Sequence, residues 1–189
     1  MNDSELVAAL QRGDESAFRQ LVEEYTPGMR RFARTFVRTH ASADEVVQEA
    51  WLGVLRGIDR FEGRSSLKTW IYRIVANVAR TRGVRDARSV PFSSEPSVDP
   101  ERFVDDGHWA SPIEPWHDVL ASELRSIVAG AIAELPGQQR AVIQLRDVEG
   151  WSSEEVCNVL ELSETNQRVL LHRARTKVRL AVEEYQHVA

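Results

Sequence analysis

Apolar residues recur at steps of three and four along most of this chain, which is the spacing of helices rather than of strands. The spacing holds in five long stretches, at residues 18–36, 46–55, 67–82, 119–134 and 138–148. Three of the predicted helices follow a residue that can cap a helix, namely Asp14, Ser42 and Ser66. Ser42 is followed three positions later by Glu45, the arrangement of a capping box. The pattern therefore predicts an all-α fold.

The segment from Ser152 onward predicts two helices joined by a short turn. Ser152 and Glu155 have the spacing of a second capping box, which opens a short helix. Residues 161–163 then turn the chain, and Ser163 can cap a long helix. Glu161 occupies a turn position where Gly is common, and a positive φ there costs a residue with a side chain about 1 kcal/mol. Helix, turn and helix in this order predict a helix-turn-helix, whose second helix enters the major groove of DNA.

The long helix after Ser163 has two different faces. Its apolar stripe packs inward and contains Leu171, Ala174, Val178, Ala181, Val182 and Tyr185. The opposite side carries Thr165, Asn166, Val169, Arg173, Thr176 and Lys177, with His172 and Arg179 at its margin. Residues 168–179 hold five Arg and Lys and no acidic residue. The pattern favours a helix that packs on one side and meets phosphates on the other, although an amphipathic hairpin with a solvated basic face is the alternative.

Composition agrees with an intracellular globular protein of one medium or two small domains. The chain has 189 residues, a single Cys and 42% hydrophobic residues. One Cys excludes an internal disulfide framework. We find no apolar run near the roughly 20 residues that a membrane span needs, and no signature of a secretory signal at the N-terminus. We therefore expect a cytoplasmic protein without membrane insertion.

The net charge of −5 hides strong local differences. Residues 1–84 carry 13 basic and 11 acidic side chains, and residues 119–189 carry 8 basic and 10 acidic ones. Residues 85–118 carry only 3 basic and 8 acidic side chains, and the helical spacing is lost from residue 86. Five Pro interrupt this stretch, which predicts an irregular acidic linker at 86–118. His108 and His117 lie in it without the Cys or carboxylate spacing of a metal site, so we expect no metal and no cofactor.

A second basic stretch runs from Arg64 to Arg85 and contains no acidic residue before Arg85. Two aromatic residues are interleaved with it. Trp70 lies on the apolar stripe of the predicted helix, which favours a place in the core over stacking on a base. Tyr72 lies off that stripe, so both interpretations stay open for it.

Four segments together identify a family. They read DEVVQEAW at 44–51, RFEGRSSLKTWIYRIVAN at 60–77, LPGQQRAVIQLRDVEG at 135–150 and LHRAR at 171–175. In this order they resemble the bacterial sigma factors of the extracytoplasmic-function group, the two-domain initiation factors of RNA polymerase. The resemblance covers nearly the whole chain except the linker. Gln167 stands where this family usually has an apolar residue, and Leu170 where it often has a basic one.

The resemblance implies three parts and their roles. Residues 1–85 would form a helical bundle like sigma region 2, and residues 119–189 a helix-turn-helix domain like sigma region 4. The core-polymerase contacts, to the β and β′ subunits, would come from Asp44, Glu45, Gln48 and Glu49. The −10 strand would be held and melted by Phe61, Arg64, Ser65, Ser66, Lys68, Tyr72, Arg73 and Asn77. The −35 element would be read by Thr165, Asn166, Arg168, Val169, His172, Arg173, Arg175 and Lys177.

The function implied is the direction of RNA polymerase to specific promoters, under the control of an anti-sigma factor. Two other classes compete with it. A stand-alone helix-turn-helix regulator would bind duplex DNA without polymerase, but it leaves the basic surface of the first 84 residues without a role. An enzyme is disfavoured because the sequence contains no Gly-rich phosphate loop, no Cys/His metal set and no Ser/His/Asp constellation.

Overall fold

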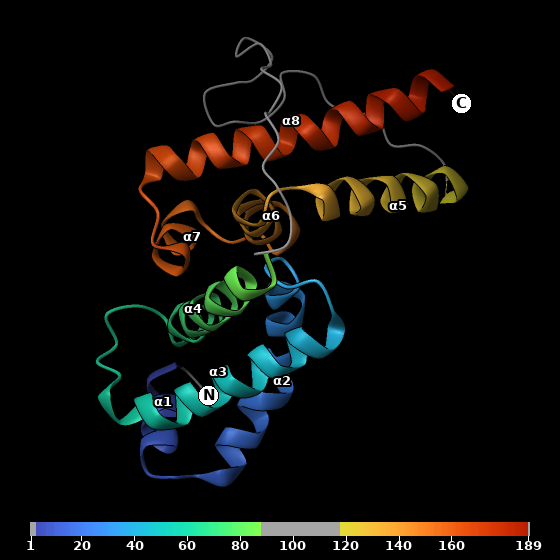
Figure 1. Cartoon of the computed structure of the whole chain (residues 1–189). Helices are drawn as coiled ribbons and strands as arrows, with labels where there is room; N and C mark the ends of the chain where they lie inside the picture. Colours follow the sequence, from blue (N-terminus) through green and yellow to red (C-terminus); the bar gives the residue numbers. More distant parts are fainter. Residues whose placement is uncertain (1–2, 88–117, 189) are drawn as a thin grey trace. The chain divides into compact units, whose positions relative to one another are not determined.

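The computed structural model describes residues 3–87 and 118–188, and this part of the chain consists of helices without a strand (Figure 1). The predicted all-α fold class is therefore confirmed. The predicted linker lies outside the described residues, apart from its first two residues and its last one. Those two residues end the helix α4, and Asp118 begins the helix α5.

Two compact units are present, one built on the N-terminal helices and one on the C-terminal helices. The first contains α1 (Asp3–Gln11), α2 (Glu15–Ala33), α3 (His40–Gly57), the 3₁₀ turn η1 (Ile58–Arg60) and α4 (Leu67–Ala87). The second contains α5 (Asp118–Glu134), α6 (Gly137–Ile143), the π-helical turn η3 (Gln144–Val148) and α8 (Glu164–Val188). The helix α7 (Ser153–Leu160) precedes α8 in the chain.

The N-terminal unit is organised around α3, which packs on both α2 and α4. Its fully buried side chains include Leu21, Met29, Phe32, Val46, Val54, Ile71 and Val75. Burial of one such side chain contributes about 1.5–3 kcal/mol to the free energy of unfolding. The helices α2 and α4 approach closely at Gly28, where an added Cβ would lie 2.2 Å from the hydroxyl oxygen of Tyr72. This approach determines how α4 is rotated within the unit.

Side-chain caps begin the helices largely where the sequence predicts them. Asp14 accepts hydrogen bonds from the N–H groups of Ser16 and Ala17, at 2.9 and 3.1 Å. Ser66 Oγ accepts from the N–H of Thr69 at 3.1 Å at the start of α4. These two predicted caps are confirmed.

The cap predicted for α3 is wrong by three residues. The helix begins at His40, and its cap is Thr39, whose hydroxyl accepts from the N–H of Ser42 at 3.0 Å. The hydroxyl of Thr39, three residues before Ser42, caps the helix by accepting a backbone N–H. The capping-box spacing at Ser42 therefore does not mark the start of the helix.

In the C-terminal unit, α8 packs along both α5 and α6. The helix predicted over 138–148 is α-helical only to Ile143 and continues as the π-helical turn η3. The N–H of Glu149 donates to the carbonyl of Gln144 at 3.0 Å, and the N–H of Trp151 donates to that of Leu145 at 2.9 Å. Asp147 lies in this turn and pairs with Arg175 of α8.

The turn between α7 and α8 has the strain that its sequence suggested. Glu161 has φ of 56°, and among the described residues it is the one non-glycine with a positive φ. The N–H of Leu162 closes the turn on the carbonyl of Cys157 at 3.1 Å. The left-handed conformation costs a residue with a Cβ about 1 kcal/mol relative to Gly.

Replacing Glu161 with Gly should therefore make the protein more stable than replacing it with Ala. Both substitutions remove the carboxylate, but only Gly removes the Cβ. We expect a difference of about 1 kcal/mol in the free energy of unfolding, measured by urea denaturation of the full chain. Gly150→Ala is the matched control, since Gly150 has φ of 71° and open space around the added Cβ, and it should destabilise. Equal stability of the Glu161→Gly and Glu161→Ala variants would contradict the strain.

Candidate nucleic-acid interface

The first turn of α8 is fixed by its cap and by a buried amide. Ser163 Oγ accepts from the N–H of Asn166 at 3.2 Å, which confirms the predicted cap. Gln167 is only 1% exposed, and its side-chain oxygen accepts from the hydroxyl of Ser153 at 3.0 Å. This bond ties the start of α7 to the first turn of α8. Gln167 thus places a buried amide at an inward-facing position of α8, where the family described above usually has an apolar residue.

An exposed strip on α8 contains five of the eight residues predicted to read the −35 element. Its members are exposed side chains on the first three turns of the helix: Thr165, Asn166, Arg168, Val169 and Arg173. Arg168 pairs with Glu164 at 2.7 Å, with both side chains more than half exposed. An exposed pair of this kind contributes little to stability, so the guanidinium can exchange its partner for a phosphate at small cost.

Arg175 does not belong to this strip. It is 7% exposed, and its guanidinium donates two hydrogen bonds to Asp147, from Nε to Oδ2 and from Nη2 to Oδ1, both at 2.8 Å. The predicted phosphate contact does not fit this placement, because two positions beyond Arg173 the helix has turned by about 200°. Thr176 is likewise 6% exposed rather than on the open side. Arg175 instead joins α8 to η3.

The remaining two predicted residues, His172 and Lys177, are half-buried beside the strip. Burial lowers the pKa of His172, and the neighbouring Arg173 lowers it further. The lowered pKa favours the neutral form of the imidazole at pH 7. A neutral imidazole offers one donor and one acceptor, which suits the edge of a base better than a phosphate.

The predicted −10 loop, residues 61–66, joins η1 to α4 in the N-terminal unit. It turns at Gly63, which has φ of 69°. The rings of Phe61 and Trp70 are tilted against each other with centroids 5.1 Å apart, and both side chains are half-buried. Trp70 is thus only partly in the core. Arg64 is exposed and pairs with Glu62 within the loop.

Tyr72 is buried and cannot stack on a base in this structure. It is 3% exposed, with its ring 5.4 Å from that of Phe32 and its hydroxyl beside Gly28. The stacking interpretation of Tyr72 therefore does not fit its placement. The other predicted −10 residues fall into two groups by exposure. Ser66, Arg73 and Asn77 are exposed, whereas Ser65 and Lys68 are half-buried.

Both ends of the −10 loop contact α1, which the sequence did not indicate. Gln11 Nε2 donates to the carbonyl of Ile58 at 3.1 Å, just before the loop. The N–H of Leu67, just after it, donates to a carboxylate oxygen of Asp3 at 3.4 Å. No spacing rule links residues so far apart in the chain, so only the tertiary fold reveals these contacts.

The predicted polymerase face lies on α3. Gln48 and Glu49 are exposed. Asp44 pairs with Arg30 at 2.6 Å, and Glu45 pairs with Arg82. Leu55, predicted to point inward, is instead 50% exposed, because the neighbouring helices cover a narrower strip of α3 than its apolar residues occupy.

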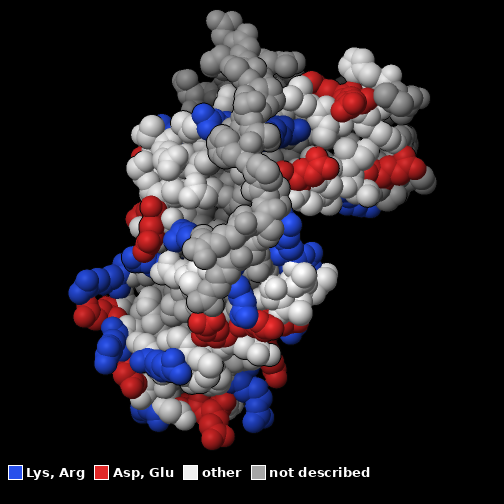
Figure 2. Space-filling model, in the orientation of Figure 1, with Lys and Arg blue, Asp and Glu red and all other residues white. Residues whose placement is uncertain are grey.

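The charges of the N-terminal unit are mixed on the visible face. Figure 2 shows Lys and Arg interspersed with Asp and Glu over its helices rather than gathered into one patch. Ion pairs of this unit include Arg30–Asp44, Arg64–Glu62 and Arg82–Glu45. Any strand bound there has to compete with these carboxylates.

Comparisons with known proteins assign the two units. The model of the family "Sigma-70 region 2" matches residues 21–89, and that of "Sigma-70, region 4" matches residues 125–178. The chain is 33% identical over 178 residues to the ECF RNA polymerase sigma-E factor of Escherichia coli, covering 94% of this chain and 93% of that protein. It is 34% identical over 182 residues to the RNA polymerase sigma-H factor of Pseudomonas aeruginosa, covering 96% and 94%. The chain belongs to the extracytoplasmic-function (ECF) sigma factors.

Solved structures agree with the fold of this sigma factor. CnrH in complex with the cytosolic domain of CnrY is similar with a TM-score of 0.66 and 24% identity, over 96% of this chain and 97% of that one. The sigma factor RpoE in complex with the anti-sigma factor NepR, from Bartonella quintana, is similar with a TM-score of 0.58 and 23% identity, over 88% and 96%. The family recognised from the four sequence segments is thus confirmed.

Within residues 3–87 and 118–188, no three His, Cys, Asp or Glu side chains gather in a way that would hold a metal ion. Every helix there is too short or too polar to cross a lipid bilayer.

Arg175→Ala should destabilise the protein, whereas Arg173→Ala should not. Removing one partner of a buried ion pair leaves an uncompensated charge, which typically costs about 3–5 kcal/mol of stability. We expect about 3 kcal/mol here, because the Asp147 side chain is 30% exposed and so partly solvated. Urea unfolding of both variants measures this contrast. In a double-mutant cycle, Arg175→Ala and Asp147→Ala should be strongly non-additive. Additive losses would show that the ion pair does not hold η3 to α8.

Proposed function

We propose that this sigma factor binds core RNA polymerase through its N-terminal unit and directs it to promoters by reading two DNA elements. Because the chain belongs to the ECF sigma factors, its general function is the initiation of transcription. The assignment of residues rests on the exposed strip of α8 and on the loop at 61–66. As a transcription factor working beside polymerase, the protein acts in the cytoplasm and catalyses no reaction of its own.

The −35 element is read by the exposed strip of α8. Asn166 and Arg173 carry the side-chain types that pair with adenine and guanine edges in the major groove. Arg168 has an exchangeable partner and contacts a phosphate. The match to the family "Sigma-70, region 4" covers residues 125–178 and so includes this strip.

The −10 element is held as a single strand at the loop 61–66 and along α4. Arg64, Arg73 and Asn77 are the exposed donors there. Phe61 and Trp70 have partly exposed rings on which an unpaired base stacks, in place of the buried Tyr72. Gln11 and Asp3 hold the ends of the loop in position for this contact.

Control by an anti-sigma protein accompanies this function. One solved relative in fold, RpoE, was determined with the anti-sigma factor NepR. We expect an inhibitor to co-purify with the tagged chain from its source cells under non-inducing conditions, and to suppress transcription when it is added back. Full activity in all growth conditions, with no inhibitor recovered, would contradict this.

Run-off transcription with purified core polymerase tests the proposed function. On fragments of the source genome, discrete new start sites should appear only when the protein is present. No new start sites, together with tight binding to duplex DNA by the protein alone, would favour the stand-alone regulator instead.

Arg173→Ala should weaken use of these promoters through their −35 element, by about 1–3 kcal/mol. The effect should concentrate on one base-pair position, because a bidentate contact carries sequence information. Arg125→Ala, an exposed Arg on α5, is the control and should transcribe as the wild type does. Unchanged promoter use by Arg173→Ala would mean that a different face of α8 meets the DNA.

A further inference from the structure

The first turn of α8 is held by a buried hydrogen bond between two side chains. Gln167 is buried, and its Oε1 atom accepts from the hydroxyl of Ser153 at 3.0 Å. Its Nε2 atom is buried as well and finds no hydrogen-bond partner in the described part of the chain. The desolvation of an unpaired amide N–H costs at least as much free energy as one hydrogen bond returns. Stability alone therefore does not favour Gln at this position.

Ser153 is itself connected to η3 through a buried residue close to it in the chain. The N–H of Trp151 donates to the carbonyl of Leu145 at 2.9 Å, and the carbonyl of Trp151 accepts from Nη1 of Arg146 at 2.6 Å. Trp151 is buried, and Leu145 and Arg146 both belong to η3. The hydrogen bond to Gln167 therefore connects the first turn of α8, by way of Ser153, to η3.

The same helix has a second anchor on η3, the ion pair between Arg175 and Asp147. Arg175 lies eight residues beyond Gln167, which is about 12 Å along the helix axis. A helix fixed at one point can still tilt about that point, whereas two separate anchors set both its rotation and its tilt. The position of Asn166, next to Gln167, then depends on the first anchor. The position of Arg173, two residues before Arg175, depends on the second.

We propose that Gln167 is a positioning residue for the −35 element: its hydrogen bond with Ser153 sets the tilt of α8 and so the depth at which Asn166 enters the major groove. This rests on the proposed function, in which Asn166 and Arg173 contact base edges. Such a contact needs a donor–acceptor distance of about 2.7–3.2 Å, so a small tilt of the helix removes it. An apolar side chain at position 167 would fill the same space without fixing a distance, because hydrophobic contacts are not directional.

Exchanging both partners for apolar residues separates positioning from stability. In the double variant Ser153→Ala, Gln167→Leu, no buried polar group loses its partner, so the midpoint of urea unfolding should stay equal or rise. Ser153→Thr is the conservative variant, because it keeps the hydroxyl that donates to Gln167.

The measurement is run-off transcription by the full-length protein with core polymerase, on a promoter and on copies of it with one −35 base pair replaced. The ratio of the two yields is the discrimination at that base pair. In the double variant, discrimination should fall about tenfold at the base pair that Asn166 contacts. It should stay unchanged at the base pair that Arg173 contacts, and Ser153→Thr should discriminate as the wild type does at both.

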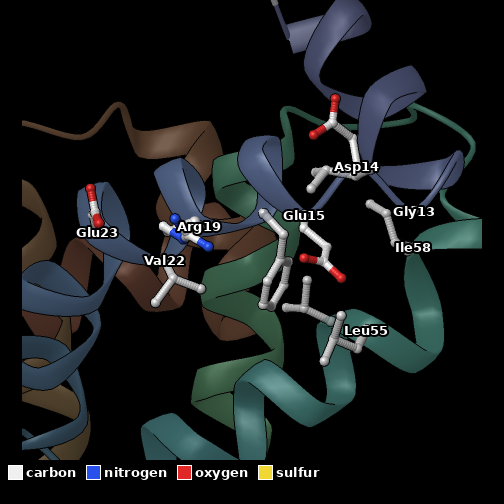
Figure 3. Close-up of a pocket in the computed structure, with 11 residues that line it drawn as sticks. Gly13, Asp14, Glu15, Arg19, Val22, Glu23, Leu55 and Ile58 are labelled. Atoms are coloured by element: carbon white, nitrogen blue, oxygen red, sulfur yellow. The ribbon is translucent and has the colours of Figure 1, made fainter.

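A control variant changes stability without touching α8. Val22 lines an apolar cavity of about 520 Å³ in the N-terminal unit, whose walls also include Phe18 and Leu55 (Figure 3). Val22→Ala enlarges this cavity and should lower the midpoint of urea unfolding. Its discrimination should match the wild type at every −35 base pair, which would show that discrimination does not simply follow stability.

A distance measurement tests the anchor without polymerase. Spin labels attached through Val148→Cys and Arg168→Cys, in a Cys157→Ala background, report the distance between the end of η3 and the first turns of α8. Val148 and Arg168 are both exposed. Pulsed electron paramagnetic resonance should give a narrow distance distribution when Ser153 and Gln167 are present and a broader one in the double variant.

Three outcomes would overturn the proposal. If the double variant discriminates as the wild type does at every −35 base pair, the hydrogen bond does not position α8. If it loses discrimination equally at all of them and unfolds at a lower urea concentration, Gln167 has a structural role only. An unchanged distance distribution would show that the bond is not an anchor. A wild type that produces no polymerase-dependent start sites would instead refute the proposed function, and the distance distribution would still show whether the bond holds α8.

Discussion

The ion pair between Arg175 and Asp147 determines which side of α8 is exposed to solvent. It fixes the rotation of the helix against η3, with the guanidinium 7% exposed and both of its bonds at 2.8 Å. Once Arg175 is turned inward, the helical period turns Asn166, Val169 and Arg173 outward. Asp147 belongs to the π-helical turn η3, so this ion pair joins that turn to α8. Arg175 thus acts as a structural support for the strip of α8 that we propose reads the −35 element.

The N-terminal unit fixes α4 by a different contact. Gly28 has no side chain, so Tyr72 enters the space beside α2 and packs on Phe32. This leaves Arg73 and Asn77 on the open side of α4. In both units, therefore, one buried polar or aromatic residue sets the rotation of a helix, and the exposed residues of that helix follow from it. Both supporting residues, Arg175 and Tyr72, are buried, whereas the sequence predicts a nucleic-acid contact for each of them.

The faces of the helices could be predicted from the sequence where periodicity alone decides them. Asn166, Val169 and Arg173 are exposed as their spacing predicts, and Ser163 caps α8 as expected. The same period turns Arg175 inward, but its partner Asp147 could not be predicted, since it lies 28 residues away. Tyr72 lies off the stripe of its helix and is buried only because α2 approaches it. Leu55 lies on its stripe and is exposed, because the neighbouring helices cover Val54 beside it but leave Leu55 outside. Tertiary contacts decide the burial of Tyr72 and Leu55 and supply the partner of Arg175.

Site-specific photo-crosslinking to promoter DNA tests the orientation of α8 most directly. A photoreactive side chain would replace Val169, which is 43% exposed on the proposed reading strip, or Ala133, which is exposed on α5. In the complex with core polymerase, the account predicts crosslinks to the −35 element from position 169 and none from position 133. Crosslinks from position 133 without any from position 169 would contradict it, and would place another face of the C-terminal unit on the DNA.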